Sequence, residues 1–261
     1  MLSVVRGRAR LAIVLAAAAL AAFAGDGPSR SFEPQSPSNP QKPTQPSPLP
    51  PPGRQLKTVV LDPAHGGTDA GAHGAGGIVE KDICLALAQA VRARLAQDGL
   101  SVVMTRQEDE TVTLDERAAI ANAQANAIFV SVHVGSTGTV GTAQAYFYDF
   151  GQLAPLPAAA TAAAAGLVPW DLAQLGSADL SRSLAQLVQA QLSERLAGSA
   201  QLPAGAAVYE LRAIAEPAIA VELASVDAGS QSALEALAGP LGAAISKGIA
   251  TFRAVYQAER R

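Results

Sequence analysis

From residue 57 to the C-terminus, short apolar runs alternate with segments of helical periodicity. Val59-Val60-Leu61 is a short buried-strand run, and apolar residues at four-residue spacing from Ile83 to Leu95 then indicate a helix that Gly99 ends. The predicted strands are 59–61, 100–104, 127–132, 143–148, 206–211 and 218–223, and the predicted helices are 80–99, 114–126, 180–196 and 234–252. This alternation predicts an α/β fold, a three-layer sandwich in which helices flank a mostly parallel twisted sheet, in a single domain.

The first 56 residues have a different composition. Three arginines lie within residues 1–10, an uninterrupted apolar run follows over 11–24, and that run ends in the small-x-small pattern Ala22-Phe23-Ala24. This arrangement is typical of a cleaved secretory signal, and the run is shorter than the roughly 20 residues of a membrane-spanning helix. We therefore expect a signal peptide over 1–24 and no stable transmembrane segment after processing, the alternative being an uncleaved anchor.

Residues 25–56 are rich in proline, serine, glutamine and asparagine, a composition that cannot build a packed core. We interpret this segment as a disordered linker, with a proline-rich docking ligand as the alternative. The domain itself then covers 57–261.

Charge and cysteine content exclude several classes of site. Residues 1–24 hold three arginines and no acid, and removing that +3 from the net charge of −3 leaves −6 for the rest of the chain. A negative chain without a run of Lys or Arg is not expected to bind nucleic acid. Cys84 is the single cysteine, which excludes an intramolecular disulfide and a multi-cysteine zinc site. Any bound metal must therefore be held by histidine and carboxylate.

Polar residues of this kind stand where predicted strands end. His65 follows the first strand, His133 follows the strand 127–132, and Glu222 closes the strand 218–223. Ligands of open α/β sheets bind beyond the carboxyl ends of the strands, so we expect these side chains to converge. Glu80 begins the first helix after a glycine-rich loop and can join them. Two histidines and one carboxylate are typical of a catalytic zinc site.

Each of these residues also has an ordinary explanation. A histidine at a strand end is commonly structural, and a glutamate that begins a helix, such as Glu80, is favoured by the helix dipole. Glu222 is different, because it stands among apolar residues, where an unpaired carboxylate costs several kcal/mol. We expect Glu222 to have a partner or an altered protonation state.

Several segments, in order, carry a family resemblance. They are 58–71 with 79–82, Thr105-Arg106 with 112–118, Ala121-Asn122 and 129–133, and Leu211-Arg212 with 217–223. Over roughly 57–256 the chain resembles the zinc-dependent N-acetylmuramoyl-L-alanine amidases, catalytic domains that cut peptidoglycan. The resemblance implies one Zn²⁺ per chain held by His65, Glu80 and His133, with Glu222 as the catalytic carboxylate. It also implies a hydrolase acting on the amide bond between N-acetylmuramic acid and L-alanine.

The signal and the linker together predict a domain exported to the periplasm or cell envelope. We expect a monomer with peptidoglycan as substrate, as the resemblance implies, and a cell-wall or division regulator as a further partner. The chain departs from the family at three places. Ala64 replaces a usual glycine, Val134-Gly135 replaces a small residue and an asparagine, and Ala224-Ser225-Val226 replaces a glycine, an aromatic residue and an asparagine. Two alternatives therefore stay open: a catalytically weak peptidoglycan-binding or regulatory protein that keeps the zinc site, and a zinc peptidase or amidase for another peptide.

Other residues have two interpretations each. Asp62 or Asp69 could orient His65, since metal-bound histidines usually donate their second N–H to a carboxylate or carbonyl. Arg106 and Arg117 could meet stem-peptide carboxylates or form surface ion pairs. The segment 150–176 is either a connector or a flap, and its Trp170 either stacks on sugar or anchors packing. We expect His73 to be an exposed loop residue and Cys84 a packing residue.

Overall fold

The computed structural model describes residues 55–152, 169–227 and 230–259. The predicted signal, nearly all of the predicted linker and the central part of 150–176 lie outside these residues. These described residues belong to one compact unit. Within the described ranges, none of the helices combines the length and the apolar character needed to cross a membrane.

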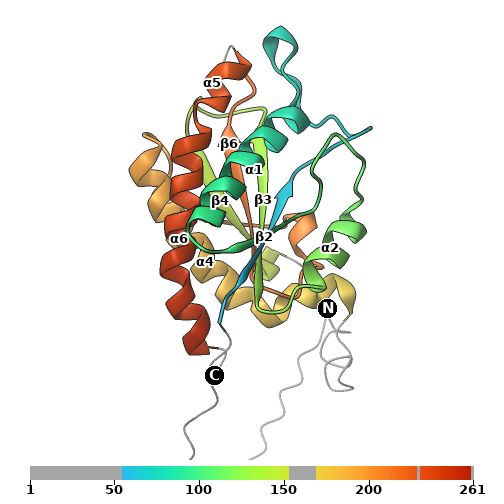
Figure 1. Cartoon of the computed structure of the whole chain (residues 1–261), viewed down its shortest axis with the longest axis vertical. Helices are drawn as coiled ribbons and strands as arrows, with labels where there is room; N and C mark the ends of the chain where they lie inside the picture. Colours follow the sequence, from blue (N-terminus) through green and yellow to red (C-terminus); the bar gives the residue numbers. More distant parts are fainter. Residues whose placement is uncertain (1–54, 153–168, 228–229, 260–261) are drawn as a thin grey trace, which may run out of the picture. The chain divides into compact units, whose positions relative to one another are not determined.

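A six-stranded mixed sheet forms the centre of the domain (Figure 1). Its strands are β1 (Thr58–Pro63), β2 (Ser101–Met104), β3 (Ala127–Gly135), β4 (Ala143–Tyr148), β5 (Ala204–Ala206) and β6 (Ala218–Ala224), in the order β2-β1-β3-β6-β4-β5. The β1/β2, β1/β3, β3/β6 and β4/β5 pairs are parallel, and only β4/β6 is antiparallel. The prediction of a mostly parallel sheet is confirmed.

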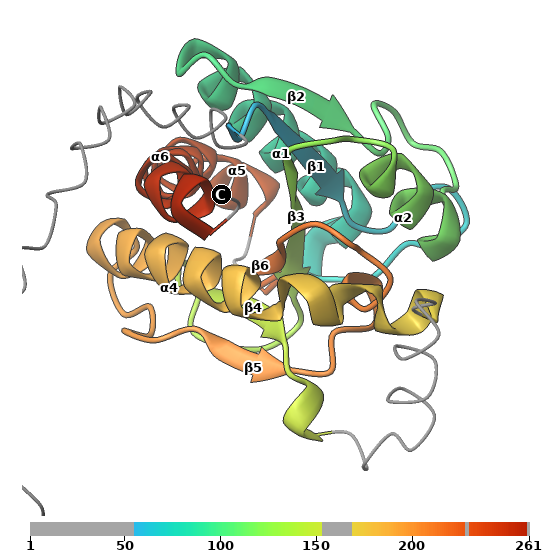
Figure 2. The same cartoon turned by 90° about the horizontal axis from the view of Figure 1, so that it is seen from below.

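Helices cover both faces of the sheet. The α-helices are α1 (Glu80–Gln97), α2 (Leu114–Asn122), α4 (Ala178–Arg195), α5 (Gln231–Glu235) and α6 (Ala238–Glu259), and short 3₁₀ helices are η1 (Ala75–Gly77), η2 (Phe150–Gln152), η3 (Trp170–Ser177) and η4 (Tyr209–Leu211). The larger core joins α1, α4 and α6 to one face, and the smaller core joins α2 and η4 to the other. Figure 2 shows α2 and α6 on opposite sides of the sheet, so the predicted three-layer sandwich is confirmed.

Strand alternation decides which residues face which core. In β1, Val59 and Leu61 pack in the larger core, whereas Val60 packs in the smaller one. In β3, Val132 and Val134 likewise face the larger core, so His133 between them points to the α2 side. The same period of two places Glu222 on that side, between Val221 and Leu223 of the larger core. Both polar side chains therefore emerge on one face.

A capping box fixes the start of α2. The Thr113 hydroxyl accepts a hydrogen bond from the Glu116 N–H at 3.2 Å, and the Glu116 carboxylate accepts one from the Thr113 N–H at 2.8 Å. These two bonds satisfy backbone donors that a helix start leaves free. The box thereby sets the direction of the first turn, which carries Arg117.

Two predicted elements differ in kind from the structure, while α2 ends at Asn122 rather than at residue 126 and β3 continues to Gly135, so that His133 lies within the strand. The strand predicted over 206–211 is wrong: β5 covers only 204–206 and pairs with β4, and 209–211 is the 3₁₀ helix η4. This turn buries Leu211 in the smaller core, which a continued edge strand would not do. The final helix is two helices, α5 and α6. Pro240 explains the break, because proline fits the first turn of a helix but not its interior.

Candidate metal centre

The predicted site residues meet at the carboxyl ends of three neighbouring parallel strands. β1 lies between β2 and β3, so the chain reverses its direction of travel across the sheet at β1, the place where open α/β sheets bind ligands. His65 follows β1, and His133 on β3 is the register partner of Glu222 on β6. Glu80 is the first residue of α1. The convergence expected from the sequence is present.

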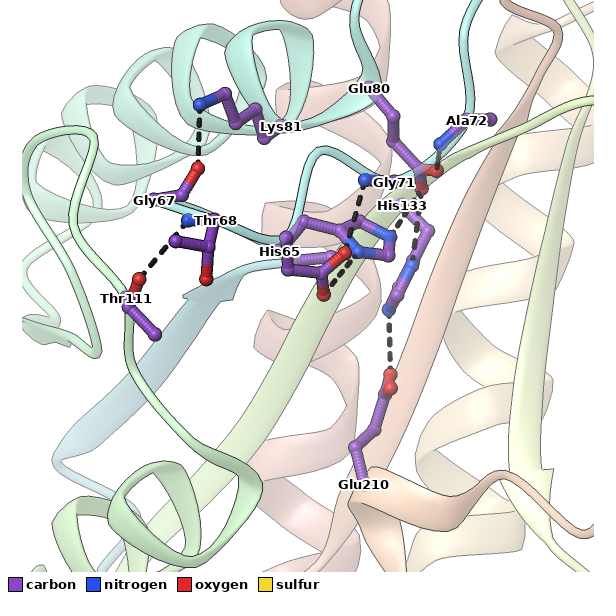
Figure 3. A network of polar contacts seen from close by, with 12 residues as sticks. His65, Gly67, Thr68, Gly71, Ala72, Glu80, Lys81, Thr111, His133 and Glu210 are labelled. Carbon is purple, nitrogen blue, oxygen red and sulfur yellow. Dashed lines mark hydrogen bonds and ion pairs between the residues drawn. The ribbon is translucent and has the colours of Figure 1, made fainter.

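Three side chains form a compact donor set. Glu80 Oε1 lies 3.2 Å from His65 Nε2 and 3.3 Å from His133 Nδ1, with Glu80 between the two rings (Figure 3). One ligand atom from each residue lies within 4.8 Å of the others. Glu80 is held in place because its carboxylate accepts hydrogen bonds from the Ala72 N–H at 2.8 Å and the Val134 N–H at 3.1 Å.

A carboxylate contacts the outer nitrogen of each histidine ring. His65 Nδ1 lies 2.9 Å from Asp69 Oδ2, and His133 Nε2 lies 2.8 Å from Glu210 Oε1 (Figure 3). A neutral imidazole that donates through its outer nitrogen presents a lone pair on its inner nitrogen. Both inner nitrogens face Glu80, so the donor set has the chemistry that zinc requires. Of the two candidates for orienting His65, the structure places Asp69 there.

The charges of the cluster support one another. Burial opposes ionisation of Glu80, but hydrogen bonds with His133, His65 and the Ala72 N–H hold the pKa of its carboxyl well below its usual range. Burial likewise disfavours charged His133, but the carboxylates of Glu210 and Glu80 raise its pKa to about 10. Contact with Glu80 also raises the pKa of His65. A metal ion that binds here must displace protons from the rings. The affinity of the site for metal therefore decreases as the pH is lowered.

Two buried arginines hold the loop that carries His65. Arg117 donates to the His65 carbonyl at 2.6 Å, and Arg106 donates to the Ala64 carbonyl at 2.8 Å and to the Pro63 carbonyl at 2.9 Å. Arg106 is 1% and Arg117 5% exposed, so the interpretation of surface ion pairs is wrong for both. Arg117 also lines the hollow that contains His65 and His133, so contact with substrate stays a prediction for this residue. Their partners are mainly backbone carbonyls of the loop, together with one buried carboxylate, Asp62.

The loop has a left-handed residue at the proposed ligand itself. His65 has φ 61°, a conformation that L residues rarely adopt, whereas Ala64 is absent from the described residues with positive φ. Alanine is therefore tolerated at the position where a glycine is usual. The Arg117 bond to the His65 carbonyl helps to hold this conformation.

Glu222 lies beside the donor set without joining it. Its carboxylate makes no hydrogen bond or ion pair within the part of the chain that the structure describes, and it lines a hollow together with His133, Tyr146 and Glu210. Burial raises the pKa of Glu222, His133 opposes this, and Glu80 and Glu210 add to it. A carboxylate of raised pKa beside a metal centre is suited to act as a general base.

The raised pKa gives a stability prediction for the metal-free protein. A raised folded-state pKa means that folding disfavours the ionised form, so Glu222 destabilises the fold above its unfolded pKa. Glu222→Gln should therefore raise the urea midpoint at about pH 7, and the gain should shrink at about pH 4, where the wild-type carboxyl is largely protonated. The exposed Glu194→Gln serves as control, and an equal or lower midpoint for Glu222→Gln at neutral pH would contradict the assigned environment.

Comparison with known proteins identifies the family. Residues 59–251, well over half of the chain, match the family described as N-acetylmuramoyl-L-alanine amidase. The chain belongs to this amidase family. All the residues of the donor set, Asp69, Glu210 and Glu222 lie inside the matched range.

Individual relatives match over shorter stretches. An uncharacterized protein, YqiI of Bacillus subtilis, is 46% identical over 80 residues, 31% of this chain and 38% of its own length. The N-acetylmuramoyl-L-alanine amidase AmiC of Neisseria meningitidis is 40% identical over 88 residues, 32% of this chain and 21% of its own. The aligned part thus spans well under half of either relative. The solved structure of AmiC2 of Nostoc punctiforme is similar with TM-score 0.57 and 28% identity, covering 77% of this chain and 98% of that one.

The structure explains one departure from the amidase family. A Cβ placed on Gly135 would lie 2.1 Å from Glu222 Oε1, so the carboxylate occupies the space that any side chain at 135 would take. The observed placement of the Glu222 carboxylate therefore requires glycine at position 135. Nothing in the structure explains the replacement at Ala224-Ser225-Val226.

Sequence reasoning missed Glu210. It lies in η4, inside the segment taken for a strand, and no spacing motif pointed to it.

The burial of individual residues decides other expectations. His73 is exposed and outside the donor set, and Cys84 is fully buried in the larger core, both as expected. Trp170 is 58% exposed and lies over the Arg212 guanidinium, so it is not a core anchor. Whether 150–176 forms a flap depends on residues 153–168, outside the described ranges.

Proposed function

We propose that this chain is an exported zinc-dependent amidase that hydrolyses the amide joining the lactyl group of N-acetylmuramic acid to L-alanine of the peptidoglycan stem peptide. One observation carries the proposal: His65, Glu80 and His133 present converging donors, and Glu222 stands beside them with no hydrogen bond or ion pair among the described residues. Membership of the amidase family supports the choice of bond. The donor set would hold one zinc per chain.

Each residue has a separable role in this proposal. Zinc held by such a set lowers the pKa of water to about 7 and polarises a carbonyl group. Glu222 accepts the proton of the attacking water at its carboxylate and returns it to the nitrogen of the leaving L-alanine as the C–N bond breaks. His65, Glu80 and His133 keep their positions throughout, since backbone N–H groups and neighbouring carboxylates fix them.

The proposal extends to where the protein works. Residues 1–24 serve as an export signal, 25–56 as a linker, and 57–261 as the catalytic domain in the periplasm or cell envelope. The N-terminal composition supports this division, because arginines, an apolar run and a proline-rich stretch follow one another. We expect a monomer, because a single chain supplies all the residues of the proposed site. The further partner that we propose is a cell-wall or division regulator.

Zinc content tests the metal part of the proposal, and the chain offers a matched control. His65→Ala should reduce bound zinc from about one per chain to near zero, because three donors are the minimum of a catalytic zinc site. His73→Ala should leave zinc unchanged, since His73 is exposed and outside the donor set. Metal analysis after gel filtration gives the answer. Wild-type protein without zinc, or His65→Ala that keeps it, would contradict the ligand assignment.

A further inference from the structure

The second carboxylate beside His133 is that of Glu210, which contacts the ring nitrogen that faces away from Glu80. We propose that Glu210 is a positioning residue that fixes the ring orientation and tautomer of His133 for metal binding. This inference rests on the proposed zinc site. It concerns a residue that neither the strand-end pattern nor the resemblance assigned.

The contact between Glu210 and His133 is short and largely buried. Glu210 Oε1 lies 2.8 Å from His133 Nε2, on the ring edge opposite Glu80 (Figure 3). The Glu210 side chain is only 16% exposed. A hydrogen bond to a carboxylate in such a setting is stronger than a neutral one and little weakened by water. His133 is thus held between two carboxylates, one for each ring nitrogen.

The backbone around Glu210 is firmly anchored, which a positioning role requires. Its neighbour Leu211 is fully buried in the smaller core, and the Leu211 N–H donates to the Val208 carbonyl at 3.1 Å. Successive residues of a 3₁₀ helix point about 120° apart, so burying Leu211 directs Glu210 elsewhere. Here that direction is toward His133.

Glu210 also shapes the space on either side of the ring. Glu210 and His133 together line two hollows: one contains His65 and Asp69, and the other contains Glu222. The pair therefore contributes to the lining of both hollows. A His133 ring released from Glu210 could rotate into either hollow and turn its inner nitrogen away from Glu80.

The partner of His65 provides an internal comparison. Asp69 makes the equivalent contact at 2.9 Å, but its side chain is 66% exposed. Water can take the place of an exposed hydrogen-bond acceptor at little cost in free energy, whereas it cannot easily reach a histidine N–H whose acceptor is buried. Removing the Glu210 carboxylate should therefore weaken metal binding more than removing that of Asp69.

The test is zinc affinity, measured by competition with a chelator, together with the imidazole N–H proton signals of the zinc-loaded protein. Glu210→Ala should weaken zinc binding roughly 10- to 100-fold. Glu210→Gln keeps the shape and one acceptor oxygen, so it should fall in between. Asp69→Asn should cost less, and the exposed Glu194→Gln nothing. The wild-type protein should show a low-field Nε2–H signal of His133 that Glu210→Ala loses.

Each outcome is decisive. Unchanged affinity and an unchanged His133 N–H signal in both Glu210 variants would overturn the positioning role. Complete loss of zinc in Glu210→Gln, as expected for His65→Ala, would overturn it in favour of direct ligation. If Glu210→Ala fails to fold, the near-isosteric Glu210→Gln still decides. Wild-type protein that binds no zinc would refute the proposed function instead, so the two failures are distinguishable.

Discussion

Glu222→Gln should lower the rate of amide hydrolysis roughly 100- to 10,000-fold, the usual contribution of a general base. Glutamine has nearly the same shape as glutamate but cannot accept the water proton. Zinc content should stay near that of the wild type, because Glu222 lies outside the donor set. The measurement is kcat on a soluble muramyl peptide, with metal analysis of the same sample.

Gly135→Ala provides an independent test of the same carboxylate. A Cβ at residue 135 would displace Glu222 Oε1, so this change should also reduce kcat while zinc is retained. Gly239→Ala is the matched control, because a Cβ there meets nothing within 4 Å. If the Glu222→Gln protein contains much less zinc than the wild type, Glu222 is a ligand and the assigned roles are wrong.

Arg106→Met should lower the free energy of unfolding of the metal-free protein by about 3 kcal/mol or more. The guanidinium donates to four backbone carbonyls, those of Pro63, Ala64, Lys81 and Glu108, at 2.8 to 3.1 Å. Methionine fills much of the volume but leaves these carbonyls without a donor. Because Lys81 follows Glu80, Arg106 also ties the His65 loop to the helix that carries the second proposed ligand.

Urea unfolding followed by circular dichroism checks this value. Arg94→Met is the control. Arg94 is half-exposed, and within the described part of the chain its side chain pairs only with Asp98 one turn away. Changes at such exposed pairs are typically within about 0.5 kcal/mol. Arg106→Lys should recover little, because an ammonium group cannot reach four carbonyls in the planar arrangement of a guanidinium. If the urea midpoint of Arg106→Met equals that of the wild type, the loop keeps its conformation without this arginine and the assigned role is wrong.

The parts of the fold that could be predicted are those in which local pattern and burial agree. The apolar runs of β1 and β3 are buried on both faces, so they appear in the sequence as unbroken strands. Their ends then locate His65 and His133. The segment 206–211 has the same apolar character, but of its residues only Ala206 pairs with β4, and Leu211 then turns into the core. That turn depends on tertiary packing, which no local pattern records.

The misread residues are those whose partners are distant in sequence. Glu210 meets His133 across 77 positions, and Arg106 reaches Pro63 and Ala64 across 43 and 42. Single long charged residues usually lie on the surface, so the pattern alone favours a solvated arginine. Only the folded loop, with its carbonyls turned inward, shows why Arg106 and Arg117 are buried.

The most direct test of the account is the chemistry of the product. Purified protein with one equivalent of zinc is incubated with peptidoglycan, and new amino termini and new reducing sugars are both counted. We predict new L-alanine amino termini without new reducing ends, lost on chelation and restored by zinc. A folded, zinc-loaded protein that releases no L-alanine termini would contradict the account and favour a peptidoglycan-binding role with a metal site kept for structure.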